Sequence, residues 1–230
     1  MYYYIEGLKN GSLSQMLSAH AVETYVERYR LDKQIEQTGG YVSGYGSGVI
    51  SNISDFSRGL NIEKRRNDIV TNIRRQYLLF TGSGVPLDVE ENDYIRMADY
   101  EKNASGEDLI ADIFPAEDVS VFEKVECFGI LDPADLEEGY SSESTLKLYE
   151  MLIKRCGGDE IRGTAAYITI GNRHFILYFD VICYEGRWYL LNTGGYTGSY
   201  FKADVLKGGA TELEKEEIAE IKSLAVPYTP

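Results

Sequence analysis

The sequence predicts an α+β fold in which a curved antiparallel sheet packs on N-terminal helices. Residues 165–192 read as three strands, because stretches rich in β-branched and aromatic residues are separated by Gly171-Asn172 and Glu185-Gly186. Such pairs supply the positive φ angles that tight hairpin turns require. The first third of the chain instead repeats apolar residues at helical spacing. Helices followed by a meander of strands indicate an α+β protein rather than alternating βα units.

The middle strand of this meander, residues 173–184, is the longest and has two different faces. Twelve residues at about 3.3 Å each span ~40 Å, and a sheet of that length normally twists and curls over a helix. One face is purely apolar and must be covered: Phe175, Leu177, Phe179, Val181 and Cys183. The other face mixes apolar and polar groups, as the wall of a cleft or a wet face would: His174, Ile176, Tyr178, Asp180, Ile182 and Tyr184.

We expect three helices in the first eighty residues. The first covers residues 2–9 and stops at Asn10-Gly11, and Ser12 caps a second helix that extends to Thr38. A third amphipathic helix over residues 61–80 is the one basic element of an acidic chain. Its cations are Lys64, Arg65, Arg66, Arg74 and Arg75. An anion or partner site is one interpretation, and a solvated face neutralised by nearby acids is the one we favour.

The remaining elements follow from stop signals and caps. Residues 81–118 look like an insertion, with a short helix expected at 107–113, and a strand is expected over 119–130. Asp132-Pro133 starts a helix, because Pro suits the first helical position. Residues 144–156 repeat apolar side chains at helical spacing until Gly157-Gly158. Thr211 and Glu214 form a capping box that predicts a C-terminal helix over 211–224.

Length and composition limit the class of protein. A chain of 230 residues fits one large domain or two small ones, and we expect a single domain. Its 43% hydrophobic and 26% charged residues are ordinary for a globular protein. The net charge of −14 argues against nucleic-acid binding, which needs a basic face. No apolar run reaches the ~20 residues of a membrane span. The opening stretch Met1 to Ile5 looks like the middle of a helix, so we expect that an N-terminal targeting or anchoring segment has been removed.

The sequence gives no sign of a cofactor or a metal. Cys127, Cys156 and Cys183 make an odd count with spacings that suit neither a disulfide framework nor zinc, so we expect small buried thiols. The acidic residues lack the loop pattern of a calcium site. The glycine-rich residues 39–48 follow a helix and lack a Lys-Ser/Thr pair, so both nucleotide-binding fingerprints fail and a surface loop is expected.

Candidate pocket residues lie in the middle of the long strand. Asp180 sits between Tyr178 and Ile182, where a buried carboxylate would have a raised pKa and a neighbouring tyrosine could polarise a carbonyl. The alternative that we favour is that Asp180 faces solvent or pairs with Arg173, Arg187 or a basic residue of a helix. No coherent catalytic set is found in the sequence.

The other candidate groups have structural interpretations. His20 is expected to pack on the apolar side of the second helix, and Trp188 is expected to anchor the core. His174 shares a face with Asp180, but six residues of strand separate them by ~20 Å, too far for a base and its orienting group.

Two stretches resemble the NTF2-like (cystatin-like α+β) superfamily, and in particular secreted, lipid-anchored domains of unknown function from Gram-positive bacteria. These are YIEGLKNGSLSQMLSAHAVETYVERY at residues 4–29 and FDVICYEGRWYLLNTGG at 179–195. The resemblance implies a curved sheet wrapped around a long helix to leave a conical cavity. It also implies an extracellular or cell-surface location, with membrane attachment only through a missing N-terminal anchor. Neither stretch is a catalytic motif.

We therefore expect a non-enzymatic, extracytoplasmic module that binds a small ligand, a peptide or a cell-surface protein at the sheet face or cavity. The alternative is a small-molecule cavity enzyme of the isomerase, dehydratase or hydrolase type, with Asp180 as the carboxylate base and Tyr178 as helper. A third interpretation is self-association, because open curved sheets of this superfamily pair face to face in homodimers.

Overall fold

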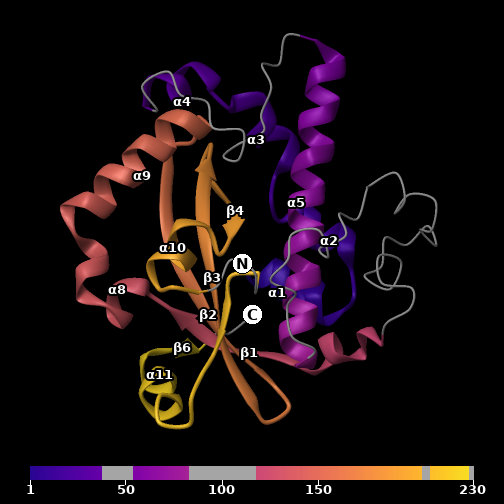
Figure 1. Ribbon diagram of the computed structural model, residues 1–230, viewed down its shortest axis with the longest axis vertical. Coiled ribbons are helices and arrows are strands. Elements are labelled where there is room, and N and C mark those ends of the chain that lie inside the picture. The colour runs from indigo at the N-terminus through magenta and orange to yellow at the C-terminus, as the bar shows by residue number, and fades with distance from the viewer. Residues whose placement is uncertain (38–53, 83–117, 204–207, 228–230) are drawn as a thin grey trace.

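A six-stranded antiparallel sheet organises the computed structural model, which describes residues 1–37, 54–82, 118–203 and 208–227 (Figure 1). The strand order is β4-β3-β2-β1-β6, and β5 also pairs with β3. The strands are β1 (Val125–Leu131), β2 (Glu160–Ile170), β3 (Arg173–Tyr184), β4 (Arg187–Thr193), β5 (Ala210–Glu212) and β6 (Val226–Pro227). The predicted fold class, an α+β protein with a curved antiparallel sheet packed on N-terminal helices, is confirmed.

The two tight turns set the register of the central strands, as predicted. Gly171 has φ 62° in the β2–β3 turn, and Glu185 and Gly186 have φ 52° and 78° in the β3–β4 turn. All twelve residues of β3 are strand, and eleven of them pair with β2. The last part of β3 pairs with β4 and the first part with β5, so these two short strands share one edge.

The apolar face of β3 is covered by the N-terminal helices and by α5, as expected. These helices are α1 (Tyr2–Lys9), α2 (Leu13–Ser18), α3 (Val22–Arg28) and α5 (Asp55–Thr81), whereas α4 (Leu31–Gln37) packs against α9 (Glu143–Cys156). Phe175, Leu177, Phe179 and Val181 join α1, α2 and α5 in the largest core cluster. Burial of such side chains contributes roughly 1.5–3 kcal/mol each, so this layer supplies much of the stability.

The opposite face of β3 is also covered, which corrects the expectation of a cleft wall or a wet face. The covering elements are α8 (Pro133–Leu136), α9 (Glu143–Cys156), α10 (Gly195–Tyr200) and α11 (Ile218–Leu224). Ile182 and Tyr184 pack in a cluster with α9, while Ile176 and Tyr178 pack in another with residues of α11. The sheet therefore lies between two helical layers, as Figure 1 shows.

The predicted second helix is broken into α2, α3 and α4, so the expectation of one helix to Thr38 is wrong. Ala21 has a left-handed backbone with φ 42°, and Tyr29 is extended with ψ 129°. The first break coincides with a contact to β4, because Leu190 N–H donates to the carbonyl of Ala19 at 2.9 Å. This bond gives a partner to a backbone N–H on the free edge of β4. Helical periodicity within residues 12–38 does not reveal such a tertiary contact.

Two other element predictions need correction. Residues 119–124 form a 3₁₀ helix and only 125–131 a strand. Ala210–Glu212 pairs with β3, so the capping box at Thr211 is wrong and the helix begins at Ile218. By contrast, the caps of α2, α8 and α9 form as expected, through Ser12, Asp132 and Gly157. The glycine-rich stretch 39–48 and the expected helix 107–113 lie outside the described residues.

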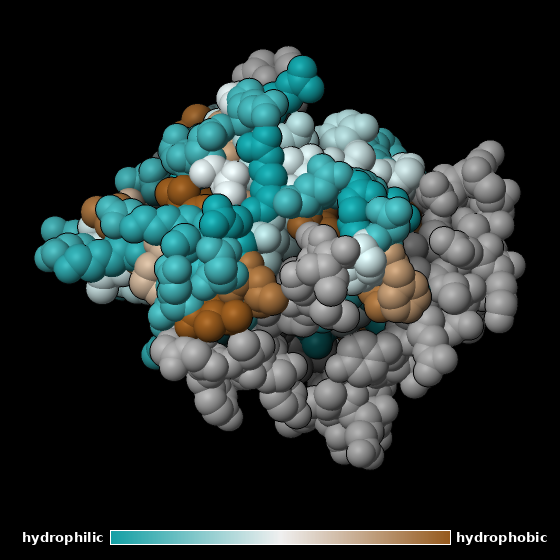
Figure 2. All heavy atoms as spheres, turned by 90° about the horizontal axis from the view of Figure 1, so that it is seen from above, coloured by the Kyte–Doolittle hydropathy of each residue, from teal (hydrophilic) through white to brown (hydrophobic). Residues whose placement is uncertain are grey.

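The surface is mainly hydrophilic on the side viewed in Figure 2, where the apolar patches are small and separate. Among the described residues, no helix combines the length and apolar character needed to cross a membrane.

Candidate functional site

Asp180 is buried beneath α10 rather than exposed on the sheet. Its side chain is 1% exposed, and one carboxylate oxygen accepts hydrogen bonds from the backbone N–H of Thr197 at 3.0 Å and its hydroxyl at 2.7 Å. The other oxygen accepts from Tyr196 N–H at 2.7 Å. The carboxylate thus holds the first turn of α10 against β3. The expectation that Asp180 faces solvent or pairs with Arg173, Arg187 or a basic residue of a helix is wrong. Its hydrogen bonds go to α10 and to Tyr149, and Arg173 instead binds Glu212 at 2.7 Å.

Two tyrosines complete a polar network around this carboxylate. Tyr149 of α9 donates to Asp180 at 3.5 Å and lies 3.0 Å from the Thr197 hydroxyl. Tyr140 bonds Thr197 at 2.9 Å and also contacts the hydroxyl of Tyr149. Burial raises the pKa of Asp180 above its usual value, against the opposing effect of hydrogen bonds from Thr197, Tyr196 and Tyr149. This cluster fixes α9 and α10 on the sheet.

Tyr178 and Ile182, the other two predicted pocket residues, point into separate packed clusters. Tyr178 is 5% exposed and stacks on Phe201 with ring centroids 5.1 Å apart. Ile182 is 1% exposed and packs in the cluster under α9. The structure therefore brings Asp180 close to Tyr149, not to Tyr178, and none of the three predicted residues lines the pocket described next.

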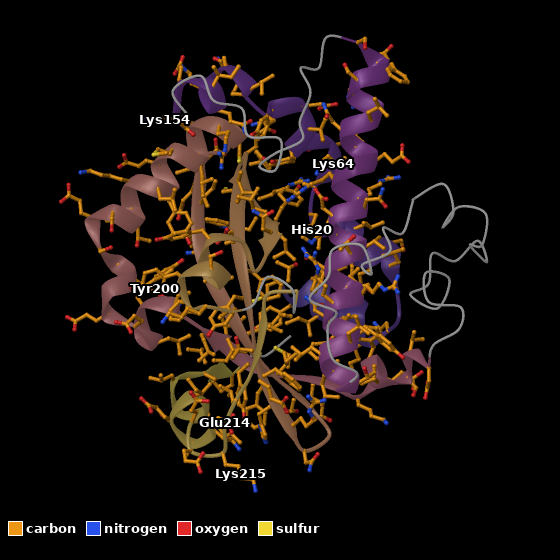
Figure 3. The ribbon with its side chains drawn as sticks, in the orientation of Figure 1. His20, Lys64, Lys154, Tyr200, Glu214 and Lys215 are labelled. Carbon is orange, nitrogen blue, oxygen red and sulfur yellow. The ribbon has the colours of Figure 1, made fainter. Side chains whose placement is uncertain are left out.

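A pocket of about 240 Å³ lies where α3, α5 and α9 meet the edge strand β4. We call it the α5–β4 pocket. Its polar lining includes His20, Asn61, Lys64, Arg65, Asp68 and Arg155. Apolar and aromatic parts of the wall come from Tyr25, Tyr29, Ile69, Leu152 and Leu191. Figure 3 shows His20 between the sheet and α5 and Lys64 on α5 itself, while Lys154 lies farther out on α9.

Arg65 is the central cation of the α5–β4 pocket. Its Nη1 donates to the Asn192 side-chain oxygen at 3.0 Å, and Nη2 donates to the carbonyl of Leu191. The guanidinium also lies 4.5 Å from the centroid of the Tyr25 ring, a cation–π contact. The expectation of a merely solvated basic face therefore fails at this residue, although Lys64 and Arg66 do pair with the acids Asp68 and Glu23.

His20 lies in the turn between α2 and α3 and is only 2% exposed. Its Nδ1 bonds the carbonyl of Leu190 at 3.1 Å, and Tyr4 meets the ring edge-on at 5.8 Å. Burial, followed by the charge of Arg65, lowers the pKa of His20 well below 6.5, so the ring is neutral. The expectation of a packed histidine is confirmed, and the structure adds that the ring lines the pocket.

Cysteine chemistry and metal binding find little support in the described residues. All three cysteines are free thiols, with Cys156 and Cys183 buried and Cys127 half-buried. Burial raises the pKa of Cys156, which lines the pocket, to about 11. A protonated thiol is a poor nucleophile. Within the part of the chain that the structure describes, no cluster of three or more His, Cys, Asp or Glu residues is arranged to hold a metal ion.

Trp188 and His174 do not contribute to the pocket. Trp188 is 40% exposed at the start of β4, with the Arg162 guanidinium 4.3 Å from its ring centroid, so the expectation of a core anchor is wrong. His174 bonds the Tyr167 hydroxyl at 2.6 Å near the far end of β3. The sequence singled out both His20 and Arg65, but it gave no sign that they meet at one edge of the sheet.

Comparison with known proteins gives one structural likeness. Neither the protein families nor the curated proteins give a match. A solved structure of a cystatin-like protein from Ruminococcus gnavus is similar, with 13% sequence identity and a TM-score of 0.48. The likeness covers 82% of this chain and 37% of that protein, so the chain spans little more than a third of its length.

Proposed function

We propose that this chain is a non-enzymatic binding module that holds a small ligand in the α5–β4 pocket. The observation that carries the proposal is a pocket of about 240 Å³ whose walls combine two arginines, a neutral buried histidine and aromatic side chains. Binding sites for small molecules are concave and bring a few polar groups together around the ligand. This pocket shares the concavity and the convergent polar groups, and more of its lining is polar than apolar.

The chemistry of the lining favours binding over catalysis. Catalysis by proton transfer needs a group whose pKa is matched to the operating pH, but burial holds the His20 pKa low and the Cys156 pKa at about 11. The buried carboxylate of Asp180 is occupied by the N–H groups and hydroxyls of α10 and α9. A group enclosed in this way positions helices rather than contacting a substrate.

A thermal-shift screen of small polar compounds tests the proposal. Leu152 lines the pocket on α9, so Leu152→Trp should fill it, while Leu146→Trp changes a 57% exposed position on the same helix. We expect compounds that stabilise the wild-type chain to lose their effect in Leu152→Trp and keep it in Leu146→Trp. Hits that are insensitive to Leu152→Trp, or the absence of any hit, would contradict the proposal.

The alternative function is a cavity enzyme that uses Asp180 as a base. The observation that favours it is a buried carboxylate with a raised pKa whose neighbour Tyr149 donates to it at 3.5 Å. Turnover of a small carbonyl compound by the wild-type chain that Asp180→Asn abolishes, and that Asp135→Asn leaves intact, would establish this function in place of the first.

Location and macromolecular partners are part of the proposal. The resemblance of residues 4–29 and 179–195 to secreted, lipid-anchored domains supports an extracytoplasmic location, with a peptide or cell-surface protein as further partner. The net charge of −14 supports the exclusion of nucleic acid. Fractionation of cells that make the natural protein tests the location, and a cytosolic fraction would contradict it. Self-association as a homodimer is a further interpretation that the sequence raised; sedimentation at high concentration tests it, and a monomeric mass would exclude it.

A further inference from the structure

Two buried polar atoms on residues of the α5–β4 pocket lack hydrogen-bond partners among the described residues. They are Nε2 of His20 and Nε of Arg65. A buried polar atom without a partner is costly, so native proteins rarely keep one unless a ligand or water binds there. Within the described ranges, the residues of one pocket thus carry an unpaired acceptor, His20 Nε2, and an unpaired donor, Arg65 Nε.

The chemistry of His20 specifies what its Nε2 can bind. The carbonyl of Leu190 can only accept, so Nδ1, 3.1 Å away, must carry the ring proton. Because the pKa of His20 lies well below 6.5, Nε2 keeps its lone pair at neutral pH. With Nδ1 bonded to β4, Nε2 is the buried ring nitrogen of His20 that is left without a partner among the described residues. A group that meets it must donate a hydrogen, as a hydroxyl or an N–H does.

The charges around the pocket decide between these donors. Lys64 pairs with Asp68 at 2.9 Å, whereas Arg65 and Arg155 form no ion pair with a carboxylate of the described residues. The lining thus carries an excess of positive charge in a chain whose net charge is −14. An ammonium donor would be repelled, and a carboxylate attracted, by these guanidinium groups. These charges disfavour a cationic donor and favour an anionic ligand whose donor to His20 is neutral, such as a hydroxyl.

Pocket size limits the ligand to a small molecule. A volume of about 240 Å³ lies below the ~300 Å³ at which pockets for drug-sized ligands begin. Ile69, Leu152 and Leu191 supply apolar wall, and Tyr25 and Tyr29 supply aromatic wall. A ligand that carries a short apolar or aromatic group next to its hydroxyl could pack that group against these side chains.

We propose that the α5–β4 pocket binds a small hydroxycarboxylate, with its hydroxyl donating to His20 Nε2 and its carboxylate held by Arg65 and Arg155. This inference rests on the proposed binding function and names the class of ligand for that same pocket.

Calorimetric titration with matched compounds tests the class. Mandelate and lactate carry both groups, phenylacetate and propionate lack the hydroxyl, and mandelamide and lactamide lack the charge. We expect at least one hydroxycarboxylate to bind about 10-fold more tightly than each of its two analogues, since a hydrogen bond to a buried polar group and a charge-assisted bond are each worth that much. Equal affinity for the analogue without the hydroxyl, or for the uncharged analogue, would overturn the proposal.

Three variants assign the effect to named side chains. His20→Asn can keep the donor to the Leu190 carbonyl while removing Nε2, so it should bind mandelate or lactate no better than the deoxy analogue. Arg155→Met should lower the affinity for mandelate and for lactate about 10-fold, because a charge-assisted contact to the carboxylate is lost. Lys154→Met is the control, since Lys154 is exposed on the same helix and does not line the pocket, and it should bind as wild type does.

The outcomes separate the two levels of the proposal. If the screen yields compounds that Leu152→Trp excludes but no hydroxycarboxylate is preferred, the ligand class is wrong and the binding function stands. If no compound of any class depends on the pocket, the binding function itself fails. Preference for a hydroxycarboxylate that survives in His20→Asn would also overturn the assignment of the hydroxyl to Nε2.

Discussion

Replacing Asp180 by Asn should loosen α10 from the sheet, because an amide cannot accept all the bonds that the carboxylate accepts. One oxygen accepts from Thr197 N–H at 3.0 Å and from the Thr197 hydroxyl at 2.7 Å, and the other accepts from Tyr196 N–H at 2.7 Å. In either orientation the NH₂ group of Asn faces a backbone N–H. At least one buried donor in the first turn of α10 therefore loses its acceptor.

The expected loss of stability is about 2 kcal/mol. Hydrogen bonds to charged groups contribute roughly 1.5–3 kcal/mol, and leaving a buried N–H unsatisfied costs ~1–3 kcal/mol. The lower desolvation cost of a neutral amide offsets part of this, so we take the middle of the range. For a chain of 230 residues, about 2 kcal/mol lowers the melting temperature by roughly 4–8 °C.

Urea unfolding followed by circular dichroism measures this difference directly. Asp135→Asn is the matched control, because Asp135 is exposed on α8 and such substitutions change stability by less than about 0.5 kcal/mol. An Asp180→Asn chain as stable as the control would refute the idea that this carboxylate organises α9 and α10. A lower free energy of unfolding, with an unchanged dependence of that free energy on urea concentration, would confirm that the substitution destabilises the folded state.

Three further predictions concern other parts of the fold. Gly163→Ala would place Cβ 1.9 Å from the Tyr140 hydroxyl, so urea unfolding should show a loss of about 1–3 kcal/mol. The pKa of His20 is lower in the folded chain than in the unfolded chain, where it is about 6.5. Below pH 6.5 the unfolded chain therefore binds a proton that the folded chain does not, and the free energy of unfolding should fall by ~1.4 kcal/mol per pH unit. The free energy of unfolding of the wild type minus that of His20→Asn, measured against pH, should show this slope. Arg162→Ala should cost ~0.5–1 kcal/mol and red-shift the fluorescence of Trp188, and an unchanged spectrum would exclude the cation–π contact.

The sequence predicts the central sheet well because its signals are local. Gly171 and the pair Glu185-Gly186 fix the two turns, and the alternation in residues 173–184 then determines which side chains share a face. The α9 helix is predicted for the same reason, since apolar residues recur at helical spacing over residues 144–156 and Gly157 ends the helix with φ 67°. These features depend on a few neighbouring residues.

Where the sequence fails, a distant contact decides the outcome. Thr211 has the sequence of a helix cap but pairs with Ile176 of β3, because the sheet edge offers hydrogen bonds that a helix start would forgo. The break at Ala21 has the same origin, since Ala19 accepts a bond from Leu190. Local propensity is a weak guide wherever such tertiary bonds form.

The candidate site illustrates the same limit. Asp180 was singled out from its place on the strand, but the partners that bury it, Thr197 and Tyr149, come from elements 17 and 31 residues away. His20 and Arg65 meet only because α5 and the α2–α3 turn both dock on the edge of β4. Side-chain periodicity shows which face each residue occupies, but it does not show which elements that face meets.

Nitrogen-15 NMR of the histidine rings tests the central claim, that His20 presents an unprotonated Nε2 to a ligand in the α5–β4 pocket. The chain has two histidines, so His20→Asn assigns the resonances without ambiguity. At neutral pH we expect His20 to be neutral with its proton on Nδ1, and we expect saturating mandelate or lactate to shift the Nε2 resonance as it accepts a hydrogen bond. A proton on Nε2, or an Nε2 resonance that stays unchanged when a hydroxycarboxylate binds, would contradict the account.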